Sequence, residues 1–185
     1  MPRVSLSPHP STPCACAGAL SVQIDRPSDD LLVLCYRIAG ELDALDLPAQ
    51  QRSAPADGLW RATCFEAFVR PVGERGYLEF NFSPSSEWAI YRFDDYRSGM
   101  RALSPQQPPK IICRRREREL DADVDVHLGS LGLPAGADLE LSLSAVLQDR
   151  TGALSYWALA HPAERPDFHH ADSFLLKLAR PASAD

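Results

Sequence analysis

The chain consists of short segments in which apolar and polar residues alternate, and this pattern limits its fold more than any other feature. Residues 139–147, LELSLSAVL, place an apolar side chain at every second position. Successive side chains of a β-strand point to opposite faces, so a period of two indicates a strand with one buried face. The sequence shows no strong helical stripe and no internal repeat. The chain is therefore expected to be all-β.

Segments of this kind recur along the chain, separated by turn-forming residues such as those of PVGERG, SPSSE and QDRTG. They predict ten strands, at residues 19–25, 31–40, 62–70, 77–83, 88–93, 110–118, 120–128, 138–149, 154–160 and 173–179. About ten short strands fold most simply as two packed antiparallel sheets. We therefore expect a two-sheet antiparallel β-sandwich.

A chain of 185 residues with 45% apolar side chains is long enough for one globular domain with a real core. We place this single domain at residues 19–180. Residues 1–18 are expected to be a flexible or extended segment that belongs to it, and residues 181–185 a tail.

The most informative segment is residues 59–96, which predicts three consecutive antiparallel strands. Tight turns would place Glu66 opposite Asn81, with Phe68 opposite Glu79 on the same pair of strands. The next turn would then place Glu79 opposite Arg92. These assumed registers gather a mixed set of side chains on one face of the sheet: Glu66, Phe68, Glu79, Asn81, Trp88 and Arg92. The opposite face is apolar and is expected to be core.

The mixed face is typical of a shallow concave binding site, in which a few polar groups lie on an aromatic floor. Sugars suit such a site because carboxylates, amides and guanidinium groups bond their hydroxyls. Aromatic rings contact their C–H faces. The structural alternative is a cross-strand ion pair between Glu79 and Arg92, with Asn81 closing a loop. The residues alone leave both interpretations open.

Residues 161–174, HPAERPDFHHADSF, hold three of the five histidines. The cluster suggests a metal site, but His169 and His170 are adjacent, so their side chains diverge in an extended loop. Aspartates form turns and prolines stiffen the path, so the segment predicts a rigid connector. A position at the rim of a ligand site is the alternative for His161 and His169. No metal is predicted.

Charge and motifs exclude several classes of function. The net charge of −6 argues against a nucleic-acid binder, and no apolar window reaches the roughly 20 residues that span a bilayer. The N-terminus lacks an apolar signal region and the five cysteines are scattered, which together predict a reduced cytoplasmic protein. The sequence contains no GxGxxG, GxxxxGK[ST], GxSxG or HExxH motif, so nucleotide cofactors have no support.

Two stretches resemble a known family. DGLWRATCFEAFVRP…GYLEFNFSPSSEWAIYRFDDYRSGM and HP…RPDFHHADSFLLKL are similar to the bacterial DOMON-like domain proteins, relatives of the family-nine carbohydrate-binding modules. The resemblance covers residues 6–178. It implies a β-sandwich of jelly-roll type that binds a ligand and performs no chemistry. It also implies that Glu66 matches the Glu of the family's E-x-F strand. Trp88 and Trp157 are candidate aromatic contacts with a ligand, although neither matches a position of the family's motif.

The function predicted from sequence is therefore a non-catalytic domain that binds a carbohydrate or sugar-like small molecule on a concave sheet face, without a cofactor. Other relatives bind haem through a Met and a His, so a haem-binding redox domain using Met100 with His161 or His169 is one alternative. A structural domain with a protein partner is another. Hydrolysis by Glu66 and Glu79 is a third alternative, because carboxyl groups about 5–10 Å apart can cleave glycosides.

Overall fold

A computed structural model describes residues 2–181 and contains twelve strands within them. The strands are β1 (Arg3–Pro8), β2 (Ala17–Asp25), β3 (Leu31–Gly40), β4 (Cys64–Pro71), β5 (Tyr77–Phe82), β6 (Trp88–Phe93), β7 (Arg101–Ala102), β8 (Lys110–Arg115), β9 (Glu119–His127), β10 (Leu139–Gln148), β11 (Leu154–Ala158) and β12 (Leu176–Leu178). Four 3-10 turns accompany them: η1 (Leu42–Ala44), η2 (Leu59–Arg61), η3 (Gly129–Leu131) and η4 (Ala171–Ser173). No helix within residues 2–181 has the length and apolar character needed to cross a membrane.

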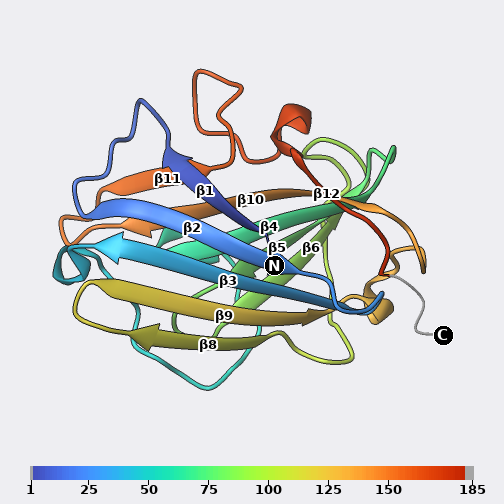
Figure 1. The fold of residues 1–185 in the computed structure, drawn as a ribbon, viewed down its shortest axis with the longest axis horizontal. Coiled ribbons are helices and arrows are strands. Elements are labelled where there is room, and N and C mark those ends of the chain that lie inside the picture. The colour runs from blue at the N-terminus through green and yellow to red at the C-terminus, as the bar shows by residue number, and fades with distance from the viewer. Residues whose placement is uncertain (1, 182–185) are drawn as a thin grey trace.

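The strands form one continuous antiparallel sheet in the order β7-β6-β5-β4-β10-β11-β1-β2-β3-β9-β8, and β12 pairs with β10. β1 joins the two halves because its first residues pair with β2 and its last two pair with β11. The sheet is curled, so β2, β3 and β9 lie over β4, β5 and β6 (Figure 1). The all-β expectation is confirmed, but the two expected sheets are two halves of one curled sheet.

The inner core fills the space between these halves. It takes side chains from β2, β3 and β9 on one side and from β4, β5 and β10 on the other. Tyr36 crosses this core, and its hydroxyl donates a 2.7 Å hydrogen bond to the backbone oxygen of Glu66. Each buried side chain of Leu or Phe size stabilises the fold by about 1.5–3 kcal/mol relative to exposure. The inner core therefore fixes the position of β4 from its inner side.

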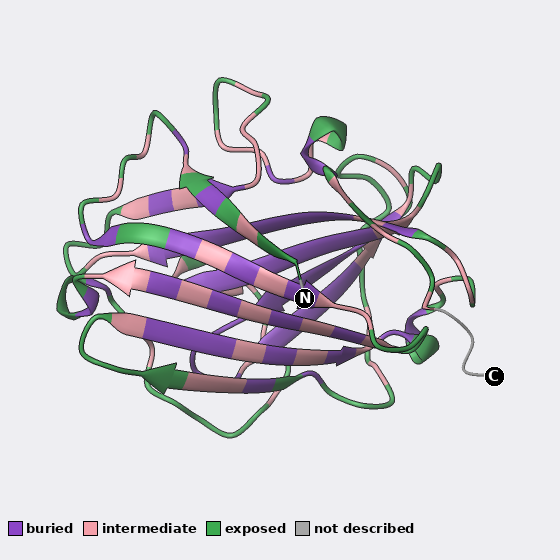
Figure 2. Cartoon of the chain, in the orientation of Figure 1, coloured by how far each residue is buried: buried purple, intermediate pink, exposed green. Residues whose placement is uncertain are grey.

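The outer face of β4, β5 and β6 is also buried, and almost every residue of these strands is inaccessible to solvent (Figure 2). A second apolar group, here named the outer cluster, covers this face: Phe68, Tyr77, Ala89, Tyr91, Phe93, Val146, Ala158, Phe168 and Phe174. Two of its members come from residues 161–174. That segment is a covering loop, which agrees with the connector predicted for it.

The register of the three central strands corrects one prediction. β4 and β5 pair as expected, with Glu66 opposite Asn81. β5 and β6 are shifted by one residue, because Phe82 rather than Ser83 lies opposite Trp88. The observed pairing leaves a three-residue loop, residues 84–86, that ends at Ser86, whose φ of 80° places it in the left-handed region. A type I turn followed by a left-handed residue is a common hairpin, but glycine usually occupies that position.

The shift moves every side chain of β6 to the face opposite the predicted one. Trp88 and Ile90 belong to the inner core, whereas Tyr91 and Phe93 belong to the outer cluster. Two short strands were not predicted: β7, and β1 within residues 1–18. Of the tail expected at 181–185, residues 182–185 lie outside the described residues.

Candidate ligand-binding site

A cavity of about 340 Å³ lies on the outer face of the sheet, within the roughly 300–1,000 Å³ range of small-molecule pockets. Its apolar lining is largely aromatic and comprises Trp60, Phe93, Met100, Val146, Tyr156, Pro166 and Phe168. Its polar lining comprises Glu66, Glu79, Arg97 and His169. The concave inner face of the sheet is already filled by the inner core. The cavity therefore lies on the outer face, where loops supply its walls.

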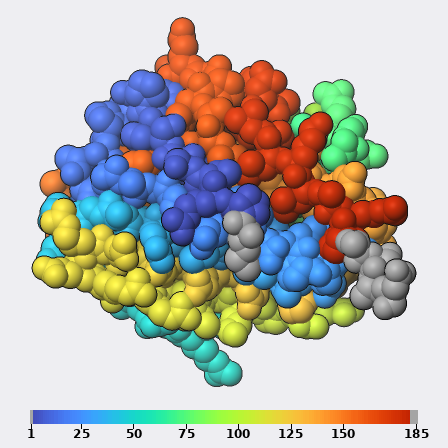
Figure 3. Space-filling model, viewed as in Figure 1, coloured from blue at the N-terminus to red at the C-terminus, as the bar shows by residue number. Residues whose placement is uncertain are grey.

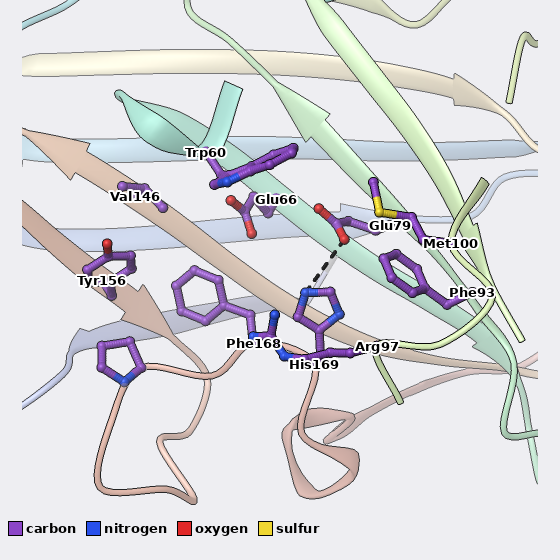
Figure 4. A pocket seen from close by; sticks show the side chains of 11 residues that line it. Trp60, Glu66, Glu79, Phe93, Arg97, Met100, Val146, Tyr156, Phe168 and His169 are labelled. Carbon is purple, nitrogen blue, oxygen red and sulfur yellow. Dashed lines mark ion pairs between the residues drawn. The ribbon is translucent and has the colours of Figure 1, made fainter. Parts of the chain in front are cut away.

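The sheet supplies the floor of the cavity and three loops supply its sides (Figure 4). Glu66 projects from β4 and Glu79 from the adjacent β5. Trp60 belongs to η2, which begins after Gly58, a residue with a φ of 73° that favours glycine. Phe168 and His169 come from the covering loop. The side chains of these residues surround the two carboxyl groups in Figure 4.

Glu66 is only 3% exposed, and its Oε1 has no hydrogen-bond partner among the described residues. Its neighbour on β10 is Ser144, whose buried hydroxyl has no partner within hydrogen-bond geometry there but lies close enough to lower the pKa of Glu66. Burial raises the pKa of Glu66 well above its usual range, and the nearby charge of Glu79 raises it further. Both effects favour the neutral, protonated form of the Glu66 carboxyl group.

Glu79 differs from Glu66 because it has a fixed partner. Asn81 Nδ2 donates a 2.7 Å hydrogen bond to Glu79 Oε1. Burial raises the pKa of Glu79, while this hydrogen bond and the charge of Arg97 oppose the rise. Asn81 is itself completely buried, and its Oδ1 accepts from Cys64 Sγ at 3.6 Å. Glu79 is therefore the more readily ionised of the two carboxyl groups.

Both ring nitrogens of His169 face polar neighbours. The Tyr77 hydroxyl lies 2.7 Å from His169 Nδ1 and shares a hydrogen bond with it. The backbone N–H of Arg97 donates to the same hydroxyl oxygen at 3.2 Å. His169 Nε2 lies 3.7 Å from Glu79 Oε2. Burial, with the charge of Arg97, lowers the pKa of His169 to about 4. The contact drawn in Figure 4 is thus a polar contact at pH 7 rather than an ion pair.

Two loops meet beside the cavity. Arg97 Nη2 and the Tyr96 hydroxyl donate to the two oxygens of Asp167, at 2.9 and 2.7 Å. Asp167 also accepts from the backbone N–H of His169. These bonds tie the loop after β6 to the covering loop and fix the backbone of His169.

Three of the nine residues predicted for the site line the cavity: Glu66, Glu79 and His169. Phe68 and Asn81 lie directly behind it, Phe68 with its ring 5.1 Å from that of His169. Their proposed contact with a ligand stays a prediction.

The other four predicted residues lie elsewhere, and their assignment is corrected. Trp88 packs in the inner core, and Arg92 on the same face donates to the backbone oxygen of Leu131, because the register of β6 differs by one residue. Trp157 also faces the inner core. His161 donates to the backbone oxygen of Ser7 at 2.8 Å, away from the cavity lining.

Several lining residues were not singled out from the sequence: Trp60, Phe93, Arg97, Val146, Tyr156, Pro166 and Phe168. Tyr156 could have been found, since the alternation of β11 that buries Trp157 turns its neighbour outward. Trp60 and Arg97 lie in loops, where no hydrophobic periodicity indicates which side chains face the cavity.

The predicted haem alternative does not fit this cavity. Met100 and His169 do line the same cavity, as a Met–His pair would require. Yet Nδ1 of His169 is bonded to Tyr77, and Nε2 faces the Glu79 carboxyl at 3.7 Å. Nδ1 is thus occupied, and iron bound at Nε2 would lie against the buried Glu79 carboxyl group.

Comparison with known proteins first identifies the class of fold. No protein-family model and no curated protein sequence matches this chain. Solved structures do match over almost its whole length, and they are β-rich domains with names that refer to carbohydrate binding. The fold of the chain is therefore that of the family-nine carbohydrate-binding modules.

A candidate carbohydrate-binding protein of Bacteroides uniformis matches with a TM-score of 0.69 and 16% identity, covering 94% of this chain and 84% of that one. A family-nine carbohydrate-binding module of Caldicellulosiruptor kristjanssonii in complex with cellotriose matches with a TM-score of 0.55 and 11% identity, covering 95% and 80%. The same module in complex with glucose gives 0.55, 11%, 95% and 82%. At such identities the likeness establishes the fold, and the ligand must be argued from the site.

Proposed function

We propose that the chain binds a carbohydrate, or a similar polyhydroxylated small molecule, in the cavity above Glu66 and Glu79. The observation that carries this proposal is a cavity with aromatic walls whose floor holds two carboxyl groups, those of Glu66 and Glu79. A buried polar group without a hydrogen-bond partner costs about 1–3 kcal/mol. A ligand hydroxyl that bonds to these carboxyl groups lowers this cost, which favours the bound state.

The remaining lining matches the same kind of ligand. Sugars combine hydroxyl groups with apolar C–H faces, and amphipathic molecules of this kind stack on aromatic rings. Glu79 accepts hydrogen bonds, and Trp60 and Phe168 offer apolar surfaces. The related fold of a module in complex with cellotriose and with glucose supports this choice of ligand.

Calorimetric titration with glucose, galactose, xylose, cellobiose and cellotriose tests the proposal. We expect saturable binding to at least one of them. Trp60→Ala and Glu66→Ala should each weaken binding roughly 10- to 100-fold, because each removes about 1.5–3 kcal/mol of contact. Glu117→Ala is the matched control, since Glu117 is exposed in the β8–β9 hairpin and takes no part in the cavity.

Each variant is first checked for native near-ultraviolet circular dichroism, so that a loss of binding is not a loss of fold. Absence of binding to every sugar at millimolar concentration would overturn the proposal. Equal affinities for wild type, Trp60→Ala and Glu66→Ala would place the sugar outside this cavity.

A further inference from the structure

The two carboxyl groups of the cavity stand on the same face of adjacent strands. Glu66 lies directly opposite Asn81, and Glu79 is two residues before Asn81 on β5. Glu66 and Glu79 are therefore diagonal neighbours, whose Cβ atoms lie about 7–8 Å apart or somewhat less. Both line the cavity, so both can reach atoms of a single bound molecule.

The two carboxyl groups can take opposite roles in proton transfer, one as an acid and the other as a base. Glu66 is almost completely buried, has an unpartnered oxygen and faces a second acidic group, all of which favour its neutral, proton-carrying form. Glu79 accepts a hydrogen bond from Asn81 and lies near the positive charge of Arg97, both of which favour its carboxylate. Neighbouring acidic groups with unequal environments commonly serve as an acid and a base.

His169 keeps the base in position. Its Nε2 lies 3.7 Å from Glu79 Oε2, and its Nδ1 is hydrogen-bonded to the Tyr77 hydroxyl at 2.7 Å. Phe68 and Phe93 hold the imidazole from two sides, at ring distances of 5.1 and 5.2 Å. The imidazole is consequently a positioning group for Glu79, and no metal or cofactor is needed for proton transfer here.

We infer that this cavity catalyses mutarotation: it opens and recloses the ring of a bound reducing sugar, with Glu79 as general base and Glu66 as general acid. The inference rests on the proposed function, since it requires the sugar to bind in this cavity.

The step balances without a co-reactant. Glu79 takes the proton of the anomeric hydroxyl, and the electron pair of that O–H bond forms the carbonyl of the open-chain aldehyde. The bond between the anomeric carbon and the ring oxygen breaks, and the ring oxygen takes the proton of Glu66. After rotation about the C1–C2 bond, the same hydroxyl attacks the other face of the carbonyl. Glu66 regains its proton, Glu79 returns its own to the carbonyl oxygen, and the other anomer is released.

The placement of the carboxyl groups favours mutarotation over glycoside hydrolysis. In glycosidases the two carboxyl groups flank the scissile bond, one on each side of it. Glu66 and Glu79 both project from the floor of the cavity (Figure 4), so a ring bound there would meet both groups on one side. The two oxygens that exchange protons in mutarotation are bonded to the same carbon, so an acid and a base on one side can serve both.

The test follows the optical rotation of freshly dissolved α-anomer, for every sugar that binds, in a dilute buffer of constant composition. We expect the first-order rate constant to rise linearly with protein concentration. Glu79→Gln should lower the protein-dependent rate at least 100-fold, a typical loss for a general base, and change the calorimetric Kd only a few-fold. Glu117→Gln should retain the full rate.

The pH profile gives a second reading that does not depend on the folding of Glu79→Gln. The rate should be bell-shaped, falling at low pH as Glu79 gains a proton and at high pH as Glu66 loses its own. Glu66→Gln should remove the alkaline limb together with most of the rate. If a sugar binds and the protein leaves its mutarotation unchanged, the inference is wrong and the proposed function stands. If no sugar binds, both are overturned.

Discussion

At the scale of single residues, Glu66 makes the stability of the fold depend on pH. Its folded-state pKa is raised by burial and by Glu79, so the folded chain holds a proton that the unfolded chain releases above about pH 4.3. A raised pKa contributes stability that is complete below the unfolded value and is lost as pH rises through the folded value. Each unit of the shift costs about 1.4 kcal/mol at high pH.

Glu66→Gln removes this dependence, because glutamine stays neutral. We expect the free energies of unfolding of variant and wild type to converge near pH 4 and to separate as pH rises to 8, with the variant the more stable. Urea denaturation across this range measures the difference. Glu117→Gln should run parallel to wild type, since Glu117 is exposed. A difference between Glu66→Gln and wild type that does not change with pH would contradict the shift.

The sequence identifies part of the site for a physical reason. Glu66 and Glu79 stand out because carboxyl groups are seldom placed among aromatic residues of a strand without a role. Their face was predicted correctly because β4 and β5 pair in the expected register. Trp60 and Arg97 were missed because they reach the cavity from loops, whose paths depend on tertiary contacts such as that between Arg97 and Asp167.

At the scale of elements, one turn residue decides the face on which every β6 side chain lies. Ser86 adopts a φ of 80°, and its backbone N–H donates to the Ser83 oxygen. That left-handed residue shifts the pairing by one position, which carries Trp88 and Arg92 away from the cavity and Tyr91 toward the outer cluster. The sequence could not show this, since serine gives no sign of a left-handed conformation.

Substitution at Ser86 tests the turn directly. Ser86→Val should destabilise the fold by about 1–2 kcal/mol or more, because a β-branched residue is strained at positive φ. Ser86→Gly should be neutral or stabilising by up to about 1 kcal/mol, since glycine adopts this conformation freely. Chemical denaturation provides both values, with Ser53→Val in an exposed loop as the control. Equal stability of the valine and glycine variants would show that Ser86 is not left-handed in solution.

At the scale of the whole molecule, the N-terminal strand connects the curled sheet to the cavity. β1 pairs with β2 and β11, and its end contacts the covering loop. His161 donates to the Ser7 oxygen, and the rings of His9 and His161 meet edge to face at 4.8 Å. Figure 3 shows the blue N-terminal segment against the orange and red segments that follow β11. The sequence predicted two separate sheets. In the structure β1 joins them into one curled sheet, and the sequence pattern did not reveal this strand.

This connection predicts that a residue outside the cavity influences binding. His9 is 3% exposed, accepts from the Ser11 backbone N–H at Nδ1 and donates from Nε2 to the Ala163 oxygen at 3.2 Å. His9→Ala leaves buried partners unpaired, so we expect a loss of about 1–3 kcal/mol and a fall in Tm of roughly 2–10 °C. It should also weaken sugar binding, because the loop that it anchors carries Phe168 and His169 to the cavity.

His127→Ala is the matched control, since His127 bonds Asp30 and does not line the cavity. A variant of His9 with lowered Tm and unchanged affinity would show that the covering loop keeps its place without β1.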